Sequence, residues 1–359
     1  MTPASDAGSA GIPGAAPRLG IMPHNPHATF TVDSAVELAV IERSGFVESR
    51  HIGSAVLLAA DGSVVTELGD ISTPVFARSA LKPFQALAAM QSGVPLRGAQ
   101  VAVACGSHTG SLDHMDVVAG MLKAAGVRED QLQCPEAWPQ DETARNWLVR
   151  SEKGKSRLAF NCSGKHAAFL WACTENGWDT HSYLEPNHPL QQRIRTVIEE
   201  YTDEKIAHLG IDGCGAPVAA VSLKGLARAF SHLAKAPGDQ SFSARAATIA
   251  TSMLDYPWAV QGRGEANTLV MDELEIIAKI GAEGVLAMAT PQGVSVAVKI
   301  LDGNVRATSL VALTLLAAAG AVEIPGVASV LEKVVDPVLG GGRPVGQIRL
   351  GPAVSALLD

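Results

Sequence analysis

The sequence predicts a mixed α+β protein, in which both ends of the chain supply an antiparallel sheet and the middle is a helical insertion. Apolar runs of strand type lie at residues 54–68 and again at 285–300. The long stretch between them has mostly helical periodicity. Strands and helices do not alternate along the chain, as they would in a doubly wound parallel sheet.

Length and composition indicate one large folded unit. The chain has 359 residues, of which 47% are hydrophobic and 18% are charged, as in a globular enzyme. We expect a single catalytic unit over residues 35–359, with a sandwich part at about 35–80 and 255–330 and a helical part at about 81–254. Residues 1–34 are rich in Ala, Gly, Pro and Ser, and we predict that they form a disordered leader.

Charge and cysteine content exclude several classes of partner. The net charge is −8 with no basic block, so neither nucleic acid nor an anionic membrane is expected to bind. No apolar run reaches the roughly 18 residues that span a bilayer, and no secretory signal pattern is visible. Five cysteines, an odd number, favour reduced thiols and a cytoplasmic location.

The first predicted element is a β-hairpin. Strands at residues 54–58 and 64–68 flank an Ala-Asp-Gly-Ser turn, and Asp-Gly between two apolar runs is a strong turn signal. A tight turn at 79–82 and a helix follow, and Gly93 can end that helix.

Ser79 and Lys82 in this turn are the first candidate catalytic pair. Residues three apart lie on one face of a helical turn, so an amine is placed beside a hydroxyl. A neutral amine there can take the hydroxyl proton and create a nucleophile. The alternative is a helix-capping serine followed by a solvated lysine. Pro83 biases Lys82 away from helical geometry, so the sequence does not fix their separation.

A second candidate hydroxyl follows an apolar run. Residues 101–105 are apolar and predict a buried strand or the start of a helix. They lead into Gly-Ser-His-Thr-Gly at 106–110, and loops after buried strands often carry catalytic side chains, here Ser107. The alternative is a surface turn. A helix at 113–125 comes next and ends at Gly126.

Two further stretches concentrate reactive side chains. Asn-Cys-Ser-Gly-Lys-His at 161–166 gathers a thiol, a hydroxyl, an amine and an imidazole before a helix at 167–176. Backbone amides at such a helix start can hold an anion. The stretch at 210–217, which contains Asp212 and Cys214, predicts an ordered turn. Taken alone, buried cysteines are more often small core residues than metal ligands.

The remaining elements complete the predicted fold. Amphipathic helices are expected at 189–201, 222–234 and 241–254, strands at 285–290 and 294–300, and an apolar helix at 311–319. The tail after Glu323 is assigned no chemistry.

Two positions in the last third bear on ligands. Gly-Arg-Gly-Glu at 262–265 lacks the spacing of a phosphate loop, so no nucleotide is expected. Lys279 lies inside an apolar run, where it either reaches solvent or stays buried with a lowered pKa and acts as a base.

Taken together, the motifs resemble the rhizobial-type, or class 3, L-asparaginases, which are similar in fold to serine β-lactamases and penicillin-binding proteins. The resemblance covers about residues 47–320. It rests on Arg-Ser-Ala-Leu-Lys-Pro at 78–83, Cys-Gly-Ser-His at 105–108, Asn-Cys-Ser-Gly-Lys-His at 161–166, Asp-Gly-Cys at 212–214 and Ala-Lys-Ile-Gly at 278–281. It implies a serine-β-lactamase-like fold and hydrolysis of L-asparagine to L-aspartate and ammonia through an acyl-enzyme.

The resemblance also implies two serine–lysine pairs. Ser79 would pair with Lys82, and Ser107 with Lys279. We expect Ser79 to be the nucleophile and Lys82 its base, with Ser107 as the rival nucleophile. Lys279 would orient or deprotonate Ser107.

The resemblance further implies a zinc ion and a substrate pocket. Zinc would be bound by Cys162, Lys165 and Cys214, and would tune substrate affinity rather than activate water. Asp212 would hold the substrate α-ammonium group. The pocket would be shaped by Arg78 and His166. The family also suggests a homodimer.

The sequence departs from the family in one loop, and alternatives stay open. Gly-Arg-Gly-Glu at 262–265 reverses the charge order expected of relatives, and Asn267 stands where a cysteine is expected, which affects side-chain selectivity. One alternative is a related serine amidase acting on glutamine, a β-lactam or a D-amino-acid peptide, although no Lys-Thr-Gly supports a β-lactam. The other alternative is a non-enzymatic zinc-binding homologue.

Overall fold

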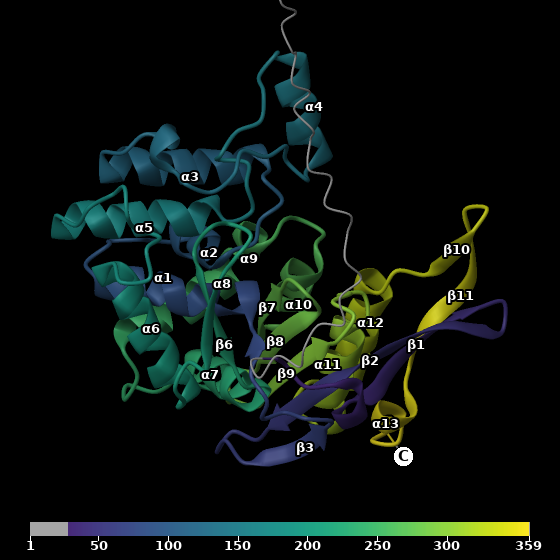
Figure 1. The fold of residues 1–359 in the computed structure, drawn as a ribbon. Helices are drawn as coiled ribbons and strands as arrows, with labels where there is room; N and C mark the ends of the chain where they lie inside the picture. Colours follow the sequence, from purple (N-terminus) through teal and green to yellow (C-terminus); the bar gives the residue numbers. More distant parts are fainter. Residues whose placement is uncertain (1–27, 359) are drawn as a thin grey trace, which may run out of the picture.

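The computed structural model describes residues 28–358, and its centre is an eight-stranded sheet in the order β10-β11-β1-β2-β9-β8-β7, with β3 paired to β2 (Figure 1). Every strand pair is antiparallel. The strands are β1 Val36–Arg43, β2 Phe46–Leu58, β3 Val64–Leu68, β7 Ile277–Gly281, β8 Val285–Ala289, β9 Ser295–Ile300, β10 Val338–Gly340 and β11 Arg343–Leu350. Strands from both chain ends thus share one sheet, which confirms the α+β class, and the β-lactamase-like fold stays a prediction.

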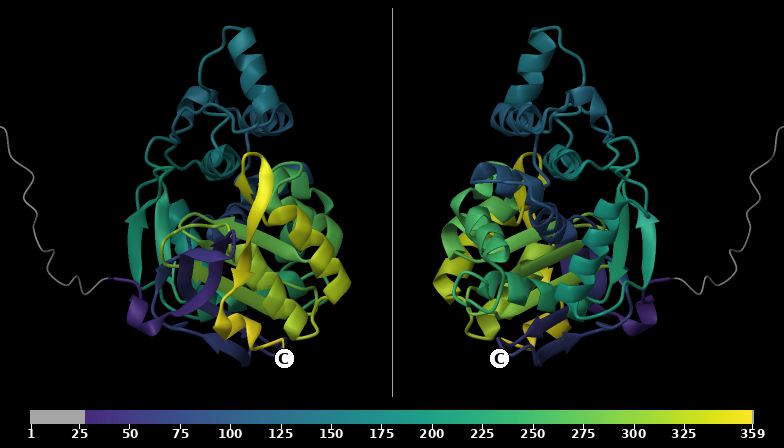
Figure 2. Two further views of the ribbon diagram at one scale, coloured as in Figure 1. Left: turned by 90° about the vertical axis from the view of Figure 1, so that its right-hand side faces the viewer. Right: turned by 90° about the vertical axis from the view of Figure 1, so that its left-hand side faces the viewer.

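Helices cover both faces of the sheet. Every residue of β8 and β9 is buried, which requires cover on both sides. α7 and α11 both pack on β8 and β9, and Figure 2 shows helices on either side of the strands. These flanking helices are α7 Leu223–Lys235, α11 Thr308–Ala318, α12 Ile324–Val334 and α13 Pro352–Ser355. α11 is apolar on nearly all sides because it lies between the sheet and α12.

A helical part fills the middle of the chain. α1 packs against α2, α5, α6 and α8, while α4 projects away from the body (Figure 1). The helices are η2 Arg78–Leu81, α1 Lys82–Gln91, α2 Ala99–Cys105, α3 Leu112–Ala125, η3 Glu129–Gln131, α4 Glu142–Arg150, α5 Ser163–Asn176, α6 Pro189–Thr202, α8 Ala244–Asp255, α9 Pro257–Val260 and α10 Ala266–Leu274. A small sheet of β4 Val75–Phe76, β6 Pro217–Val221 and β5 His208–Ile211 lies beside them.

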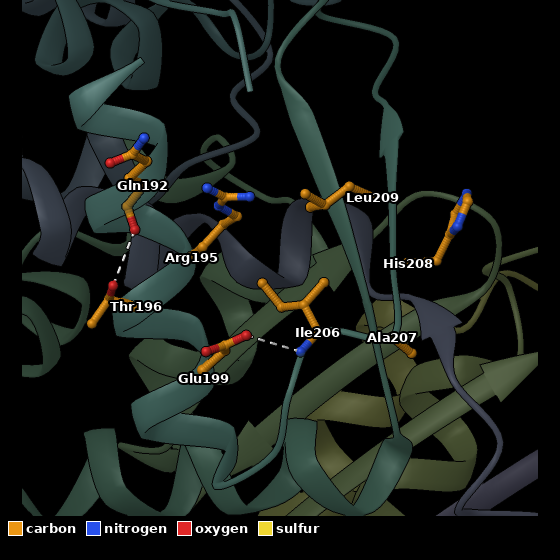
Figure 3. Close-up of a pocket in the computed structure, with 8 residues that line it drawn as sticks. All are labelled: Gln192, Arg195, Thr196, Glu199, Ile206, Ala207, His208 and Leu209. Atoms are coloured by element: carbon orange, nitrogen blue, oxygen red, sulfur yellow. Dashed lines mark hydrogen bonds between the residues drawn. The ribbon is translucent and has the colours of Figure 1, made fainter. Parts of the chain in front are cut away.

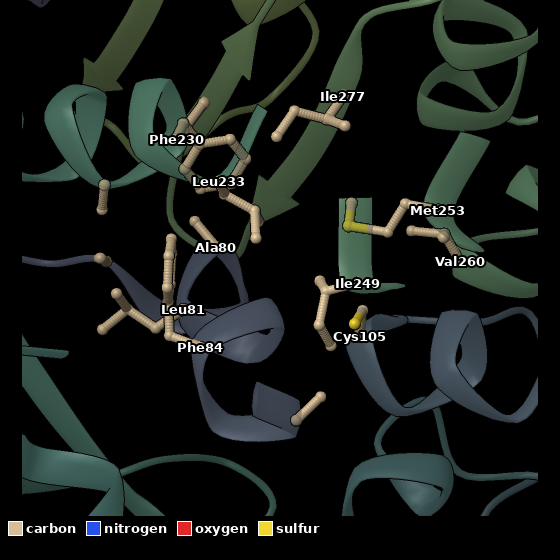
Figure 4. Close-up of a cluster of buried hydrophobic side chains, with 14 of the residues drawn as sticks. Ala80, Leu81, Phe84, Cys105, Phe230, Leu233, Ile249, Met253, Val260 and Ile277 are labelled. Carbon is tan, nitrogen blue, oxygen red and sulfur yellow. The ribbon is translucent and has the colours of Figure 1, made fainter. Parts of the chain in front are cut away.

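One core joins the two parts. Figure 4 shows Leu81 and Phe84 facing Phe230 and Leu233 of α7, with Ile277 of β7 nearby. All five side chains are at most 1% exposed. Because burial of apolar area is the main driving force of folding, this shared core fixes η2 and α1 relative to the sheet.

Residues 101–105 lie in a helix, α2, which is one of the two predicted alternatives, and the predicted turn within 210–217 is flanked by strands β5 and β6, which were not predicted. The predicted leader reaches residue 34, but Phe30 is buried and η1 Val32–Ser34 is a 3-10 helix. Residues 1–27 lie outside the described part. The sandwich part does not stop at 330, because β10 and β11 extend the sheet.

No helix in residues 28–358 is both long and apolar enough to cross a membrane.

Candidate active site

The predicted catalytic residues meet where the helical part abuts the edge of the sheet. Ser79 lies in η2, and Lys82 is the first residue of α1. Lys279 lies on β7, the edge strand that packs against η2. Ser107 follows α2 directly, in a loop held by a hydrogen bond from its backbone N–H to Val260 O (2.7 Å).

Gly281 permits the close approach of β7 to η2. A Cβ atom at Gly281 would lie 2.6 Å from Ala77 O and 3.3 Å from Ala80 N. Ordinary van der Waals contact begins near 3.4 Å, so no side chain fits there without moving a backbone. The Lys-Ile-Gly sequence of β7 therefore supplies both the Lys279 amine and, at Gly281, the space that lets β7 approach η2.

Lys82, Ser107 and Lys279 form one hydrogen-bonded cluster. Lys82 Nζ and Lys279 Nζ each lie 3.0 Å from Ser107 Oγ. Lys82 Nζ also donates to Gly106 O and to Asn161 O. The two lysines are 1% and 0% exposed, respectively, which makes this a pair of buried amines around one hydroxyl.

The hydrogen bonds distinguish the two amines. Lys82 has three acceptors around Nζ, which suits the three donors of an ammonium group. Burial and the neighbouring charge of Lys82 hold the pKa of Lys279 well below its usual value. A neutral Lys279 can donate to Ile280 O (2.7 Å) and accept the hydroxyl proton of Ser107. This arrangement can deprotonate Ser107.

Ser79 differs from Ser107 in having a free side chain. It is half-buried, and within residues 28–358 neither its Oγ nor its backbone N–H makes a hydrogen bond. The residue before it, Arg78, has φ of 52°, the left-handed region that non-glycine residues rarely occupy. Such strained positions gather at functional sites. Ser79 is thus accessible, unpaired and held at a strained turn.

Arg78, the residue before Ser79, forms a partly exposed ion pair with Asp212. Arg78 Nε and Nη2 lie 2.8 and 2.7 Å from Asp212 Oδ1, which also accepts from Gly213 N–H. The Oδ2 oxygen of Asp212 makes no hydrogen bond within the described residues. A carboxylate and a guanidinium side by side can bind the two charged groups of an α-amino acid.

Cys162, Lys165 and Cys214 converge beside the cluster. Cys162 caps α5, Lys165 lies in its first turn, and Cys214 comes from the turn between β5 and β6. Lys165 Nζ lies 3.1 Å from Cys214 Sγ. A hydrogen bond from Cys162 and the charge of Lys165 lower the pKa of Cys214, whereas the pKa of Cys162 is raised. The geometry favours a Cys214 thiolate against a Lys165 ammonium.

The donor set suits a zinc ion only if the lysine takes part. Two thiolates are good zinc ligands, and all three side chains are buried. No three His, Cys, Asp or Glu side chains gather as a metal site anywhere in residues 28–358. The third protein donor therefore has to be the Lys165 amine, which is an unusual ligand.

His166 lies behind the thiols. It is fully buried, and its Nδ1 lies 2.8 Å from the hydroxyl of Tyr183. The family resemblance implies that His166 shapes the substrate pocket, and this role stays a prediction; its ring packs against Phe169 and Tyr183.

His108 ties the Ser107 loop to α5. Its Nδ1 accepts from Gly110 N–H, so Nε2 donates to Ser163 Oγ (2.9 Å). Its ring stacks on His114 with 4.8 Å between centroids, and His114 Nε2 donates to Trp258 O. Burial lowers the pKa of both histidines, so both are neutral in this network.

A cavity elsewhere carries none of these residues. It has a volume of about 540 Å³ and lies between α6 and β5, where Figure 3 shows Glu199, Arg195 and Leu209 among the lining side chains. Glu199 accepts from Ile206 N–H at its floor. No catalytic constellation faces this cavity among the residues that line it.

The hydrogen bonds of the cluster differ in one respect from the two serine–lysine pairs expected from the sequence. The sequence pairs Ser79 with Lys82, but the Lys82 amine hydrogen-bonds to Ser107 instead. The carbonyls of Gly106 and Asn161 draw it there. A sequence motif does not show which backbone carbonyls accept hydrogen bonds, and Tyr183 lies outside all of the motifs. The sequence analysis therefore did not identify these groups.

A comparison with known protein families identifies the family of the chain. The family model for L-asparaginase II matches residues 39–350, nearly the whole described chain. A search of curated proteins finds no match. The match confirms the family that the motifs resemble. The chain belongs to the L-asparaginase II family and is a hydrolase of that type.

Proposed function

We propose that this protein hydrolyses L-asparagine to L-aspartate and ammonia through an acyl-enzyme on Ser79. The observation that supports this most is the buried Lys82–Ser107–Lys279 cluster next to an accessible, unpaired Ser79. A nucleophile and a base with a lowered pKa are what amide cleavage without a metal-bound nucleophile requires.

The substrate would be recognised as a free amino acid. Arg78 would bind the α-carboxylate with the donors that Asp212 leaves free, and Asp212 Oδ2 would accept from the α-ammonium group. Both side chains are partly exposed, so the substrate can reach them. Because Arg78 directly precedes Ser79, the same contacts would bring the side-chain amide to the hydroxyl.

The proton path begins at the neutral amine. Lys279 takes the proton of Ser107, and Ser107 takes one from Lys82 in exchange. Lys82, one turn after Ser79, is then a neutral base and accepts the Ser79 proton as Ser79 attacks the amide carbon. Lys82 returns this proton to the departing nitrogen, which leaves as ammonia.

Water then completes the reaction. A water molecule gives a proton to Lys82 and attacks the ester, and Ser79 recovers its proton as aspartate leaves. The backbone N–H of Ser79, which makes no hydrogen bond within residues 28–358, would be one donor of the oxyanion hole.

A zinc ion is proposed beside this path. Cys162, Lys165 and Cys214 would hold it, with the two thiolates as its main ligands. When bound, it would supply positive charge near the α-amino-acid clamp and tune substrate affinity. We also expect a homodimer, as the family resemblance implies, and light scattering measures this oligomeric state. A cytoplasmic location is proposed from the five cysteines.

The test is ammonia release from L-asparagine and L-glutamine by wild type, Ser79→Ala and Ser107→Ala. Turnover of asparagine should fall by about 10³-fold or more in Ser79→Ala. Ser107→Ala should lose about 10²–10⁴-fold because the proton path is broken. A wild-type protein that releases ammonia from neither amide would refute the proposal, and preferred turnover of glutamine would change the substrate.

A further inference from the structure

His166 has a ring nitrogen with no hydrogen-bond partner. The side chain is 0% exposed, and its Nε2 makes no hydrogen bond within residues 28–358. An unsatisfied buried polar group destabilises a protein by about 1–3 kcal/mol. Such a group in a native fold calls for an explanation, and a functional role is one.

Tyr183 determines which ring nitrogen carries the proton. The backbone N–H of Gln133 donates to the Tyr183 hydroxyl oxygen (2.8 Å). The hydroxyl proton is then free to donate to His166 Nδ1, also at 2.8 Å. The opposite tautomer would leave the buried hydroxyl proton without an acceptor. Nδ1 is therefore the acceptor, and Nε2 carries the hydrogen.

The unpaired N–H lies on the face of α5 that carries the sulfur centre. Cys162, Lys165 and His166 follow the spacing i, i+3 and i+4, so their side chains share one face of the helix start. Cys214 is the one proposed ligand that does not come from α5, and its Sγ lies 3.1 Å from Nζ of Lys165, the residue next to His166. Within the turn, Cys214 lies between two exposed glycines, Gly213 and Gly215.

We propose that His166 is a positioning residue for the metal centre, and that its Nε2–H donates to the Cys214 sulfur when that sulfur is a metal-bound thiolate. The inference rests on the proposed zinc site. His166 would orient Cys214 and would not bind the metal, because a protonated Nε2 has no lone pair to offer. His166, Cys162 and Cys214 also do not gather closely enough to form a three-ligand site.

The expected effect of His166 on zinc affinity can be taken from metal centres whose ligands are oriented by similar hydrogen bonds. Partners that orient a metal ligand typically change metal affinity by 10–100-fold when they are removed. His166→Phe keeps an aromatic ring against Phe169 and Tyr183 but removes the N–H. Tyr183→Phe keeps the packing and removes only the hydroxyl that selects the tautomer, so its effect should be smaller.

The experiment measures zinc affinity of the full-length protein by competition with a chromophoric chelator, and Co²⁺ binding by visible absorption. His166→Phe should weaken zinc binding by about 10–100-fold, and Tyr183→Phe by a few-fold. The Co²⁺ ligand-field bands should keep their positions and intensities, because the ligand set is unchanged. His232→Phe on α7, a histidine away from the thiols, is the matched control and should bind zinc as wild type does.

Three results would overturn the inference. The first is unchanged zinc affinity in folded His166→Phe or, if that variant does not fold, in Tyr183→Phe. The second is a change of Co²⁺ bands in His166→Phe that indicates loss of a nitrogen ligand. The third is a wild-type protein that binds no zinc, in which case ammonia release by the same preparation reports separately on the amidase proposal.

Discussion

Replacing Gly281 with alanine tests how closely strand β7 must approach η2. The added Cβ would lie 2.6 Å from Ala77 O, about 0.8 Å closer than ordinary contact, and 3.3 Å from Ala80 N. Both of these atoms belong to the backbone. One of the two elements has to move by several tenths of an ångström. Overpacking of this kind destabilises by about 1–3 kcal/mol. Displacement of catalytic groups by about 1 Å can reduce the rate by about 10²-fold.

The assay combines steady-state ammonia release with urea unfolding. Gly281→Ala should lower kcat by about 10–100-fold, because Ser79 and Lys279 lie on the two elements that are pushed apart. Gly120→Ala in the exposed part of α3 is the matched control, since its Cβ meets nothing within 4 Å. That control should gain about 0.5–1 kcal/mol and keep full activity. A Gly281→Ala protein with wild-type kcat and stability would refute the reasoning.

Three further predictions concern charge. Lys279→Arg replaces a neutral amine with a cation that cannot lose its proton, so kcat/KM should fall by about 10²–10⁴-fold, and rates near wild type would exclude Lys279 as a base. Asp212→Asn should raise KM for asparagine by about 10–100-fold, but should not change the use of succinamate, which lacks the ammonium group; equal losses on both would refute the clamp. Since burial lowers the folded-state pKa of His108 and His114 below 6.5, stability is full above that pH. Below pH 6.5, each histidine should lower the free energy of unfolding by up to about 1.4 kcal/mol per pH unit. Urea unfolding at several pH values should show that the free energy of unfolding of His114→Phe falls less steeply with decreasing pH than that of wild type.

The sheet could be predicted from the sequence because its strands carry strong local signals. Asp-Gly between two apolar runs fixes the β2–β3 hairpin, and the apolar runs of β8 and β9 are buried on both faces. β10 and β11 were not predicted. β11 consists only of half-buried and exposed residues, and it is held by pairing with β1, a contact between opposite chain ends. Such pairing has no local signature.

The sequence predicted which residues form the site, but not which of them are joined by hydrogen bonds. Side-chain spacing suggested that Lys82 serves Ser79, whereas the structure directs the amine of Lys82 to Ser107 and two carbonyls. Those acceptors belong to loops that only the tertiary fold brings together. The same holds for Tyr183, which reaches His166 from 17 residues away. Motifs identify reactive groups, and the backbone between them decides which groups meet.

The most direct test of the proposed mechanism is to identify the acylated residue. Wild-type protein would be mixed with L-asparagine, quenched in acid during turnover, digested and analysed by mass spectrometry, with Ser107→Ala treated in parallel. The account predicts an aspartyl group on the wild-type peptide that contains Ser79, and less of it in Ser107→Ala, because the broken proton path slows acylation. No adduct in Ser79→Ala is the expected control. An aspartyl group on the Ser107 peptide of wild type would contradict the account, and so would ammonia release with Ser79 absent.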